Sequence, residues 1–365
     1  MAVIKIAEMK NGVPLRMDLD KIRNRHGLIS GDSGSGKTYC TEYLCMQWCK
    51  AKSPVLVLDY SGSFKRNQLE EPLREMEDIG VLRREVIYTN GLSVNPALPQ
   101  MKDVEENILE KKADTIMRVA DILKKALNLT AVQKNIVYRI ISDIYAGREL
   151  DSFNYILENI IQKLLEEQEA GMNSIYAGAN GIHILNKMQA LTDQKIFLNE
   201  QEVYWEKMQD GAITLMDFSY FEASIQQALI EAVLWDFWNY WTNNGKRRNI
   251  MVLLDEFQLL EFGKGSVLEL ILTQGRKHGI NLWLSTQAIV GNFDKKQQKN
   301  LSQVATRIIF KPSEEDIKML RDSYGKNAER FSGMRRGECF IDSEVLGFSG
   351  ETVSIKTFAV IPKIY

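Results

Sequence analysis

The sequence contains no run of apolar residues that approaches the ~20 needed to span a bilayer. Its four cysteines, Cys40, Cys45, Cys49 and Cys339, form no C-x-x-C pair, and no nearby histidine or cysteine completes a metal site. The net charge of −2 excludes binding through an overall basic surface, so any nucleic-acid surface has to be local. We therefore expect a cytoplasmic protein with reduced thiols, no signal peptide and no membrane span.

A glycine-rich run at residues 31–38 matches the phosphate-binding pattern G-x-x-x-x-G-K-[ST]; it comprises Gly31, Asp32, Ser33, Gly34, Ser35, Gly36, Lys37 and Thr38. Glycines allow the backbone to curl so that its N–H groups point at phosphates. We expect Lys37 to reach the β- and γ-phosphates of a nucleoside triphosphate and the Thr38 hydroxyl to bind Mg²⁺. A strand at 26–30 and a helix at 39–50 flank the run, which favours this interpretation over a Gly/Ser-rich surface turn.

A second group of polar residues follows two apolar runs. Residues 249–254 end in Asp255 and Glu256, the arrangement of a Walker B strand. Asp255 is expected to hold Mg²⁺, and Glu256 to polarise the attacking water. Gln287, after the run at 281–285, fits a sensor of the γ-phosphate. The alternatives are a strand that runs out into solvent at Asp255 and a plain strand terminus at Gln287.

Further short, β-branched runs predict a sheet. They lie at residues 54–58, 85–88, 212–216, 306–310, 338–341 and 353–361. Most are apolar throughout, as in a parallel sheet buried on both faces, and helical patterns separate many of them. The pattern therefore predicts the α/β class with a doubly wound, mostly parallel sheet.

The stretch from 101 to 209 departs from this alternation. It shows helical patterns at 103–127, 131–146 and 151–170, a loop at 171–181 and no convincing strand. We interpret it as a helical subdomain inserted in the sheet domain. The predicted domains are a core at 1–99 and 212–365 and an insertion at 100–211.

Two other candidates have structural alternatives. Arg276 and Lys277 end a predicted helix, where basic residues stabilise the C-terminus, but Arg276 could instead serve as an arginine finger in a neighbouring subunit. Competing arginines are Arg307, Arg335 and Arg336. Asp59, after the strand at 54–58, could orient the nucleotide's water or cap the next turn.

Taken together, these motifs resemble the HerA/FtsK superfamily of RecA-like motor ATPases. The stretch 275–287, from Gly275-Arg276-Lys277-His278-Gly279 to Leu284-Ser285-Thr286-Gln287, is similar to the signature of HerA and the conjugation ATPases. Residues 57–62, 212–219 and 334–339 also resemble the family's motifs. The ~25 residues before the first core strand are too few for the β-barrel with which HerA proteins begin. Ser63 stands where many relatives carry glutamate.

The resemblance implies a RecA-like fold, ATP and Mg²⁺ as cofactors, and a homohexameric ring through which DNA, usually double-stranded, is threaded. Loops at 261–266 and 293–299 are candidates to line the channel. One alternative is a conjugation- or secretion-type ATPase that moves protein. Another is an ATP-gated scaffold for a nuclease or other effector.

Overall fold

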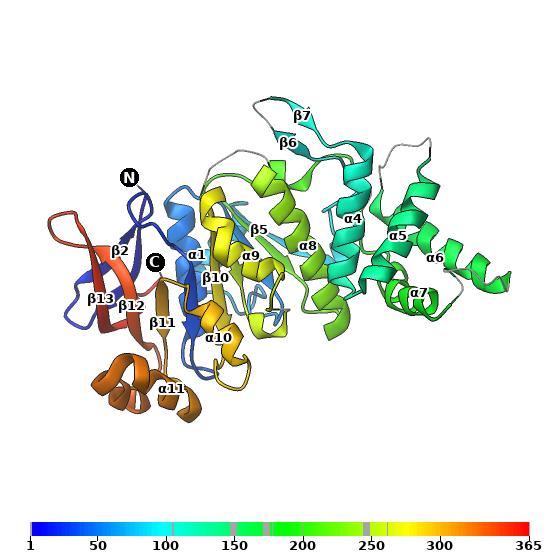
Figure 1. Cartoon of the computed structure of the whole chain (residues 1–365). Coiled ribbons are helices and arrows are strands. Elements are labelled where there is room, and N and C mark those ends of the chain that lie inside the picture. Colours follow the sequence, from blue (N-terminus) through cyan, green and yellow to red (C-terminus); the bar gives the residue numbers. More distant parts are fainter. Residues whose placement is uncertain are drawn as a thin grey trace. The chain divides into compact units, whose positions relative to one another are not determined.

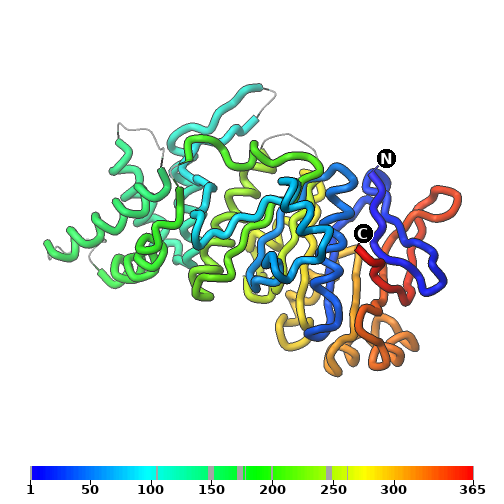
Figure 2. Tube along the Cα trace, turned by 180° about the vertical axis from the view of Figure 1, so that it is seen from behind, coloured from blue at the N-terminus to red at the C-terminus, as the bar shows by residue number. Residues whose placement is uncertain are grey.

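The computed structural model describes residues 2–103, 106–146, 152–170, 176, 178–198, 200–243, 249–260 and 262–364. The chain divides into two compact units (Figures 1 and 2). Unit 1 comprises residues 1–85, 209–219 and 247–365, and unit 2 comprises residues 86–208 and 220–246.

Unit 1 is built on an eleven-stranded sheet with the order β2-β1-β13-β12-β11-β3-β10-β9-β4-β8-β5. The strands are β1 (Val3–Met9), β2 (Pro14–Asp18), β3 (Gly27–Ser30), β4 (Val55–Asp59), β5 (Leu82–Val86), β8 (Ile213–Asp217), β9 (Ile250–Leu254), β10 (Ile280–Thr286), β11 (Thr306–Ile309), β12 (Glu338–Leu346) and β13 (Thr352–Val360). From β11 to β8 every neighbouring pair is parallel. β12, β13, β1 and β2 extend the sheet in antiparallel pairs.

Helices cover both faces of this sheet, as the doubly wound prediction requires. They are α1 (Lys37–Lys50), α2 (Glu71–Asp78), α9 (Val267–Gln274), α10 (Lys295–Leu301) and α11 (Glu314–Tyr324), with 3₁₀ turns at Phe257–Leu259, Gly275–His278 and Gly325–Gly333. On one face, α1 packs with Ile29, Val57 and Leu253 in the main core cluster. On the other, Leu28 and Ile309 border a small cavity with Leu301 of α10 and Leu320 of α11. The predicted α/β class is confirmed.

Unit 2 is mostly helical. Its elements are α3 (Ile87–Asn90), β6 (Met101–Asp103), β7 (Ile108–Leu109), α4 (Lys112–Ala126), α5 (Ala131–Ile144), α6 (Phe153–Glu169), α7 (Ala179–Thr192), a 3₁₀ turn at Tyr204–Lys207 and α8 (Ala223–Asn243). The fully buried Asp236 of α8 accepts hydrogen bonds from Arg118 of α4 (3.2 Å), Trp205 (2.8 Å) and Gln100 (2.9 Å). Burial raises the pKa of Asp236, and the Arg118 guanidinium opposes that rise. The ion pair between Arg118 and Asp236 connects α4 to α8, and both of its side chains are buried.

Several predicted bounds differ from the structure. The helix predicted at 103–127 begins only at Lys112, because β6 and β7 before it pair with one another as antiparallel strands, and Asp103 accepts the Glu106 N–H at 3.0 Å. An aspartate that caps a turn was thus mistaken for the start of a helix. Residue 151 and residues 171–175, in the predicted third helix and loop, lie outside the described residues, and α7 already begins at Ala179.

The sheet also differs at its edges. The strand predicted at 85–88 is β5, which starts at Leu82 and ends at Val86, where the chain turns into α3. β1 and β2 were not predicted; their polar and apolar residues are mixed, as is usual for strands near a sheet edge. Unit 2 takes in residues 86–99 and α8, which the sequence assigned to the core, because α8 packs on α4.

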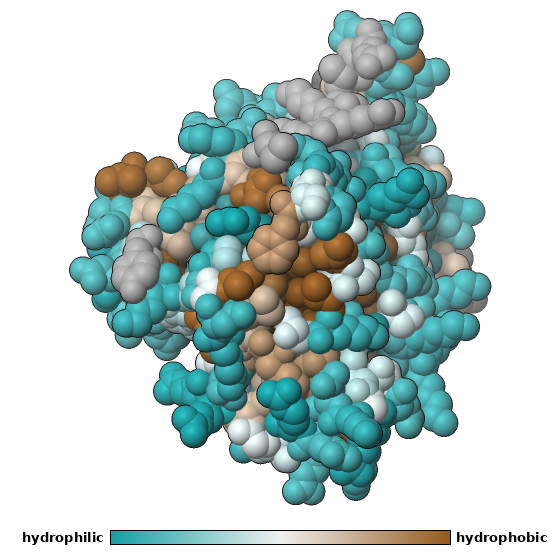
Figure 3. Space-filling view, turned by 90° about the vertical axis from the view of Figure 1, so that its left-hand side faces the viewer, coloured by the Kyte–Doolittle hydropathy of each residue, from teal (hydrophilic) through white to brown (hydrophobic). Residues whose placement is uncertain are grey.

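The surface view in Figure 3 shows one face of the molecule, on which hydrophilic residues surround a central group of hydrophobic ones. Within the described part of the chain, no helix is both long and apolar enough to cross a membrane.

Candidate active site

The phosphate-binding loop leaves β3 in a conformation that only glycine adopts easily. Gly31 has φ +146°, and a Cβ there would lie 2.7 Å from the Phe310 Cβ. Gly36 has φ +118° and is the N-cap of α1. Any other residue at either position would be strained, because L side chains disfavour positive φ. The loop therefore presents the N-terminus of α1 as an anion-binding end.

Segments distant in sequence hold this loop in place. The Asp32 N–H donates to the Lys311 carbonyl at 2.8 Å, and the Gly337 N–H donates to the Ser35 carbonyl at 2.9 Å. These bonds fasten the loop to the chain after β11 and to the turn before β12. The cradle is thus preformed by long-range contacts rather than by its glycines alone.

Lys37 folds back over the loop that precedes it. Its Nζ donates to the carbonyls of Gly31 (2.7 Å) and Asp32 (3.0 Å). Burial lowers the pKa of Lys37, while the carboxylates of Glu256, Asp255 and Asp32 act in the opposite direction. Lys37 is thus a buried cation at the edge of the cavity, where it can pair with a phosphate oxygen.

Asp255 follows β9 and is held by two hydroxyls from the loop after β4. Ser61 Oγ and Ser63 Oγ donate to Asp255 Oδ2 at 2.8 and 2.5 Å. Asp255 is buried and still borders the cavity, as does Thr38. A carboxylate and a hydroxyl that face one space are suitable oxygen ligands for Mg²⁺. The sequence did not single out these serines as partners of Asp255.

Glu256 adopts a left-handed backbone conformation, with φ 52°. Its Oε1 accepts a hydrogen bond from Gln287 Nε2 at 2.9 Å, and its Oε2 accepts from Gln258 Nε2. β10, which Gln287 follows, lies between β3 and β9 as expected for a sensor strand. A non-glycine residue at positive φ is uncommon, and such strain clusters at functional sites.

Asp59 is a loop cap rather than a wall of the cavity. It is fully buried, and it accepts backbone N–H groups from Gly62 (2.9 Å), Ser63 (3.2 Å) and Phe64 (3.0 Å). Burial, with Asp217 and Asp255 nearby, raises the pKa of Asp59 to about 7 although these N–H groups lower it. Of the two alternatives for Asp59, the geometry supports the cap, because Asp59 is not among the residues that line the nucleotide cavity.

These groups meet in one cavity of about 520 Å³. It is lined by Ser33, Gly34, Gly36, Lys37 and Thr38 from the loop, by Asp255, Glu256 and Gln287 from the strand ends, and by Tyr39, Glu42, Gln68, Glu70, Phe310, Arg336, Gly337, Ile361 and Lys363. The volume lies within the usual range for a small-molecule site. The cavity has a cationic and N–H-rich end opposite carboxylates, which suits a nucleotide with a divalent cation.

The predicted arginines lie in different places. Arg336 lines the cavity, whereas Arg276 is exposed in the turn before β10. Arg276 lies near His26, whose pKa is lowered to about 4, first by burial and then by the charge of Arg276. His26 precedes β3, at the opposite end of the strand from the loop, so Arg276 does not face the cavity of its own chain. Arg307 donates toward the Tyr324 hydroxyl at 3.4 Å on the face of α11. A role for Arg276 in a neighbouring subunit stays a prediction.

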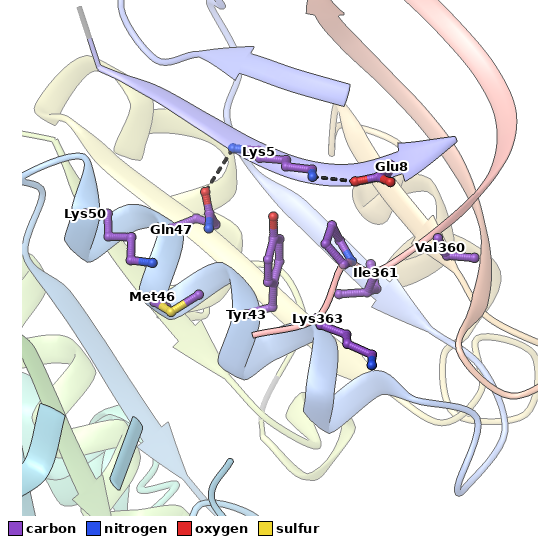
Figure 4. A pocket seen from close by; sticks show the side chains of 10 residues that line it. Lys5, Glu8, Tyr43, Met46, Gln47, Lys50, Val360, Ile361 and Lys363 are labelled. Atoms are coloured by element: carbon purple, nitrogen blue, oxygen red, sulfur yellow. Dashed lines mark hydrogen bonds and ion pairs between the residues drawn. The ribbon is translucent and has the colours of Figure 1, made fainter. Parts of the chain in front are cut away.

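The C-terminal residues form a wall that the sequence did not indicate. Tyr39 Oη donates to the Pro362 carbonyl at 3.1 Å and accepts the Ile364 N–H at 2.7 Å. Ile361 and Lys363 also border a second cavity of about 540 Å³, between β1 and α1, which Figure 4 shows with the Lys5–Glu8 pair and Tyr43. Residues that are far apart in the sequence thus line both cavities.

Clusters of metal-binding side chains and the cysteines are the remaining candidates for a functional site. Among the described residues there is no group of three or more His, Cys, Asp and Glu side chains that could hold a metal ion. A P-loop Mg²⁺ site does not need one, because water and phosphate oxygens supply most ligands. The four cysteines are buried and unpaired, and Cys49 Sγ donates to the Gly211 carbonyl.

Glu42, one turn after Thr38, gives the first testable prediction. Its Oε2 accepts the Glu70 N–H at 2.9 Å, and burial raises its pKa to about 7 from 4.5. Glu42 ionises at a lower pH in the unfolded chain than in the folded protein. The wild type therefore loses stability as pH rises from about 4.5 to 7. Glu42→Gln removes this loss while keeping an acceptor. Relative to wild type, we expect the variant to gain on the order of 2 kcal/mol between pH 5 and pH 8.

Unfolding curves of both proteins at the two pH values measure this difference. Asp59 and the other acidic residues are present in both proteins, so their contributions to the pH dependence cancel when the two proteins are compared. Glu75→Gln, at an exposed position on α2, is the control and should show a much smaller pH dependence. An equal pH dependence of Glu42→Gln and wild type would contradict the assignment.

The comparisons identify the class and then the family. The sheet, the loop at 31–38 and the carboxylates after β9 define a RecA-like P-loop ATPase. The chain belongs to the family described as "Helicase HerA, central domain", whose model matches residues 4–236. This confirms the resemblance drawn from the motifs. A search of the curated proteins finds no match.

Solved structures share the fold over nearly the whole chain. VirB4 of Thermoanaerobacter pseudethanolicus matches with a TM-score of 0.68 at 17% identity, covering 97% of this chain and 95% of that chain. The plasmid coupling protein TrwB in complex with ADP and Mg²⁺ matches with a TM-score of 0.67 at 13% identity, covering 100% and 95%. At such low identity these likenesses show the fold alone.

Proposed function

We propose that the protein is an ATP-hydrolysing ring motor that translocates DNA. The observation that carries this proposal is the single cavity in which the loop at 31–38 meets Asp255, Glu256 and Gln287. Membership of the HerA family and the fold shared with TrwB, which binds ADP and Mg²⁺, support it. We place the ATPase in unit 1 and regard unit 2 as its inserted helical subdomain.

The loop end of the cavity binds the nucleotide. Backbone N–H groups of residues 33–38 and the Lys37 ammonium neutralise the phosphates. Thr38 and Asp255 would hold Mg²⁺, with Ser61 and Ser63 fixing the orientation of the Asp255 carboxylate. The chemistry that Mg²⁺ would supply there is neutralisation of the charge on the phosphates.

The carboxylate end performs the proton chemistry. Glu256 accepts a proton from the attacking water, and the Gln287 amide holds the Glu256 carboxylate in place. The left-handed backbone at Glu256 directs this side chain to the cavity instead of along the strand. An arginine from the neighbouring subunit, with Arg276 as the candidate, would complete the charge stabilisation in a hexameric ring.

Two loops after β9 and β10 supply the DNA contact in this proposal. Lys264 is exposed on the first, whereas Lys295, Lys296 and Lys299 are exposed on α10, which takes up most of the stretch 293–299 that was predicted as the second loop. The loops touch one another, because Gln297 Nε2 donates to the Phe262 carbonyl and the rings of Phe262 and Phe293 lie 5.9 Å apart. Glu261, at the start of the first predicted loop, lies outside the described residues. Exposed lysines on adjoining loops can follow a phosphate backbone, with double-stranded DNA as the expected partner.

The proposal predicts that double-stranded DNA stimulates ATP hydrolysis and that the stimulation fades with salt. If the four loop lysines each neutralise one phosphate, the apparent DNA affinity should fall roughly 100-fold between 50 and 200 mM salt. Steady-state hydrolysis with and without DNA at these two concentrations measures this. Alanine at Lys264 and Lys296 should reduce the salt dependence and leave DNA-free turnover unchanged. Turnover that is indifferent to DNA at both salts would contradict a DNA motor.

A protein-moving ATPase is the second candidate. The net charge of −2 and the fold shared with VirB4 favour it. It would require a protein partner, and not DNA, to stimulate hydrolysis. A scaffold for a nuclease or other effector would instead assemble with ATP and hydrolyse it slowly.

A further inference from the structure

A buried carboxylate outside the cavity holds the segment that follows Gln287. Asp316 is 1% exposed, on the first turn of α11. Its two oxygens accept the Ile289 N–H at 3.2 and 3.1 Å, and its Oδ1 accepts the Val290 N–H at 2.7 Å. One side chain therefore fixes two successive peptide groups of a segment that lies 26 and 27 positions away in the sequence.

Local helix chemistry does not explain this arrangement. Ser313 is the N-cap of α11, and its hydroxyl accepts the Asp316 N–H at 3.2 Å. In a capping box, the acidic side chain at this position would turn back to the N–H of the N-cap residue. Asp316 is directed to residues 289 and 290 instead. Burial raises the pKa of Asp316, and the two N–H groups lower it. The carboxylate is thus removed from water and has these N–H groups as hydrogen-bond partners instead.

The segment that Asp316 anchors connects Gln287, which contacts Glu256, to the lysine-rich stretch 293–299. At one end, Gln287 donates to Glu256 at 2.9 Å. The turn is closed by the Phe293 N–H on the Ile289 carbonyl at 3.2 Å, and Gly291 takes a left-handed φ of 91°. At the other end, Phe293 stacks on Phe257, the residue after Glu256, with 4.8 Å between centroids. The stretch 293–299, predicted as a loop, begins there, and from Lys295 onward it is the helix α10.

The far side of Asp316 is connected to the phosphate-binding loop. α11 follows β11 through Lys311, whose carbonyl accepts the Asp32 N–H at 2.8 Å. The Asp32 carboxylate is near enough to raise the pKa of Asp316. Asp316 thus lies where the chain beside the phosphates meets the segment after the sensor strand. The hydrogen bonds of Asp316 and of Lys311 thus connect the two.

We propose that Asp316 is a positioning residue that couples the nucleotide cavity to the loop at 293–299. The proposal rests on the proposed ATPase function, but it does not require the cargo to be DNA. A change in the contact between Glu256 and Gln287 shifts residues 288–290 against the Asp316 anchor. The turn at Gly291 and the Phe293 stack carry this shift to the loop. Without the anchor, the segment moves freely and the loop no longer follows the nucleotide.

Hydrogen–deuterium exchange of the full chain, with and without a non-hydrolysable ATP analogue and Mg²⁺, tests this coupling. In the wild type we expect the analogue to slow exchange in residues 31–44 and in residues 288–301. In Asp316→Asn, one acceptor oxygen becomes an amide donor that faces the backbone N–H groups. The response should persist in residues 31–44 and be lost in residues 288–301.

Glu314→Gln is the matched control, because it removes the same charge from the same helix turn at an exposed position. It should respond as the wild type does. Gly291→Ala strains the turn without touching the carboxylate and should also uncouple residues 293–301, so it replaces Asp316→Asn if that variant does not fold.

A wild-type response at 288–301 that survives in Asp316→Asn would overturn the proposal and leave Asp316 a structural cap. So would a folded variant that loses the response in both segments, or a wild type with none at 288–301. Failure of the DNA-motor proposal would look different: hydrolysis would ignore DNA while the exchange response at 288–301 still depended on Asp316.

Discussion

Glu256→Gln is expected to bind ATP with near wild-type affinity and to hydrolyse it ~10² to 10⁴ times more slowly, the range that general acid–base catalysis contributes. The amide keeps the size of the side chain and an oxygen acceptor for the Gln287 Nε2, which lies 2.9 Å from Glu256 Oε1. It has no basic oxygen to take the proton of the attacking water. The loss should therefore appear in kcat and leave nucleotide binding largely unchanged.

Nucleotide titration with a fluorescent analogue and steady-state hydrolysis measure the two quantities separately. Glu315→Gln, an exposed change outside the cavity, should alter neither. Persistent hydrolysis by Glu256→Gln would mean that another group is the base. A parallel loss of ATP affinity would mean that Glu256 supports the cavity wall rather than the chemistry.

Lys37→Ala should lower hydrolysis to background and weaken ATP binding by roughly 10- to 100-fold, as expected for the loss of a hydrogen bond to a charged group. Lys37 is the buried cation of the cavity end that faces Asp255 and Glu256. Its removal takes away the cation of the phosphate-binding loop, which faces those carboxylates and would face the phosphates. It also frees the carbonyls of Gly31 and Asp32, which Lys37 Nζ holds at 2.7 and 3.0 Å.

Calorimetric ATP binding and steady-state turnover measure both effects. The matched control is Lys50→Ala, at the exposed last turn of the same helix and outside the nucleotide cavity. It should bind and hydrolyse ATP as the wild type does. Normal turnover in Lys37→Ala would remove the assignment of the phosphate-binding loop.

Contiguous motifs could be predicted from the sequence because their geometry is mostly local. The loop at 31–38 carries its own glycines, cation and hydroxyl, and α1 begins at Lys37, two residues before the helix predicted at 39–50. The apolar strands β3, β4, β8, β9, β10 and β11 were predicted because burial on both faces leaves uninterrupted apolar runs. Strands near the sheet edges, such as β1 and β5, carry charged residues among apolar ones, so the same rule missed or shifted them.

Other parts depended on pairs that are distant in the sequence. The sequence left open whether Asp59 orients the nucleotide's water or caps the next turn, and in the structure three backbone N–H groups of its own loop use its oxygens. It assigned α8 to the core, whereas the buried contact between Arg118 and Asp236 attaches α8 to unit 2. Neither outcome can be derived from residue spacing, because each requires knowing which buried polar groups find one another.

The sequence by itself determined that this chain is an α/β P-loop ATPase, and it predicted Lys37, Thr38, Asp255 and Glu256 as the site residues, which the structure brings to one cavity. Each of these roles depends on a short run of neighbouring residues whose backbone conformation is largely local. Only the tertiary structure decided that Arg336 and the C-terminal residues wall the cavity and that Ser61 and Ser63 hold Asp255. It alone joined Asp316 to residues 289 and 290. Those contacts exist because the sheet order brings distant strand ends to one edge, and that order is set by packing of the whole unit.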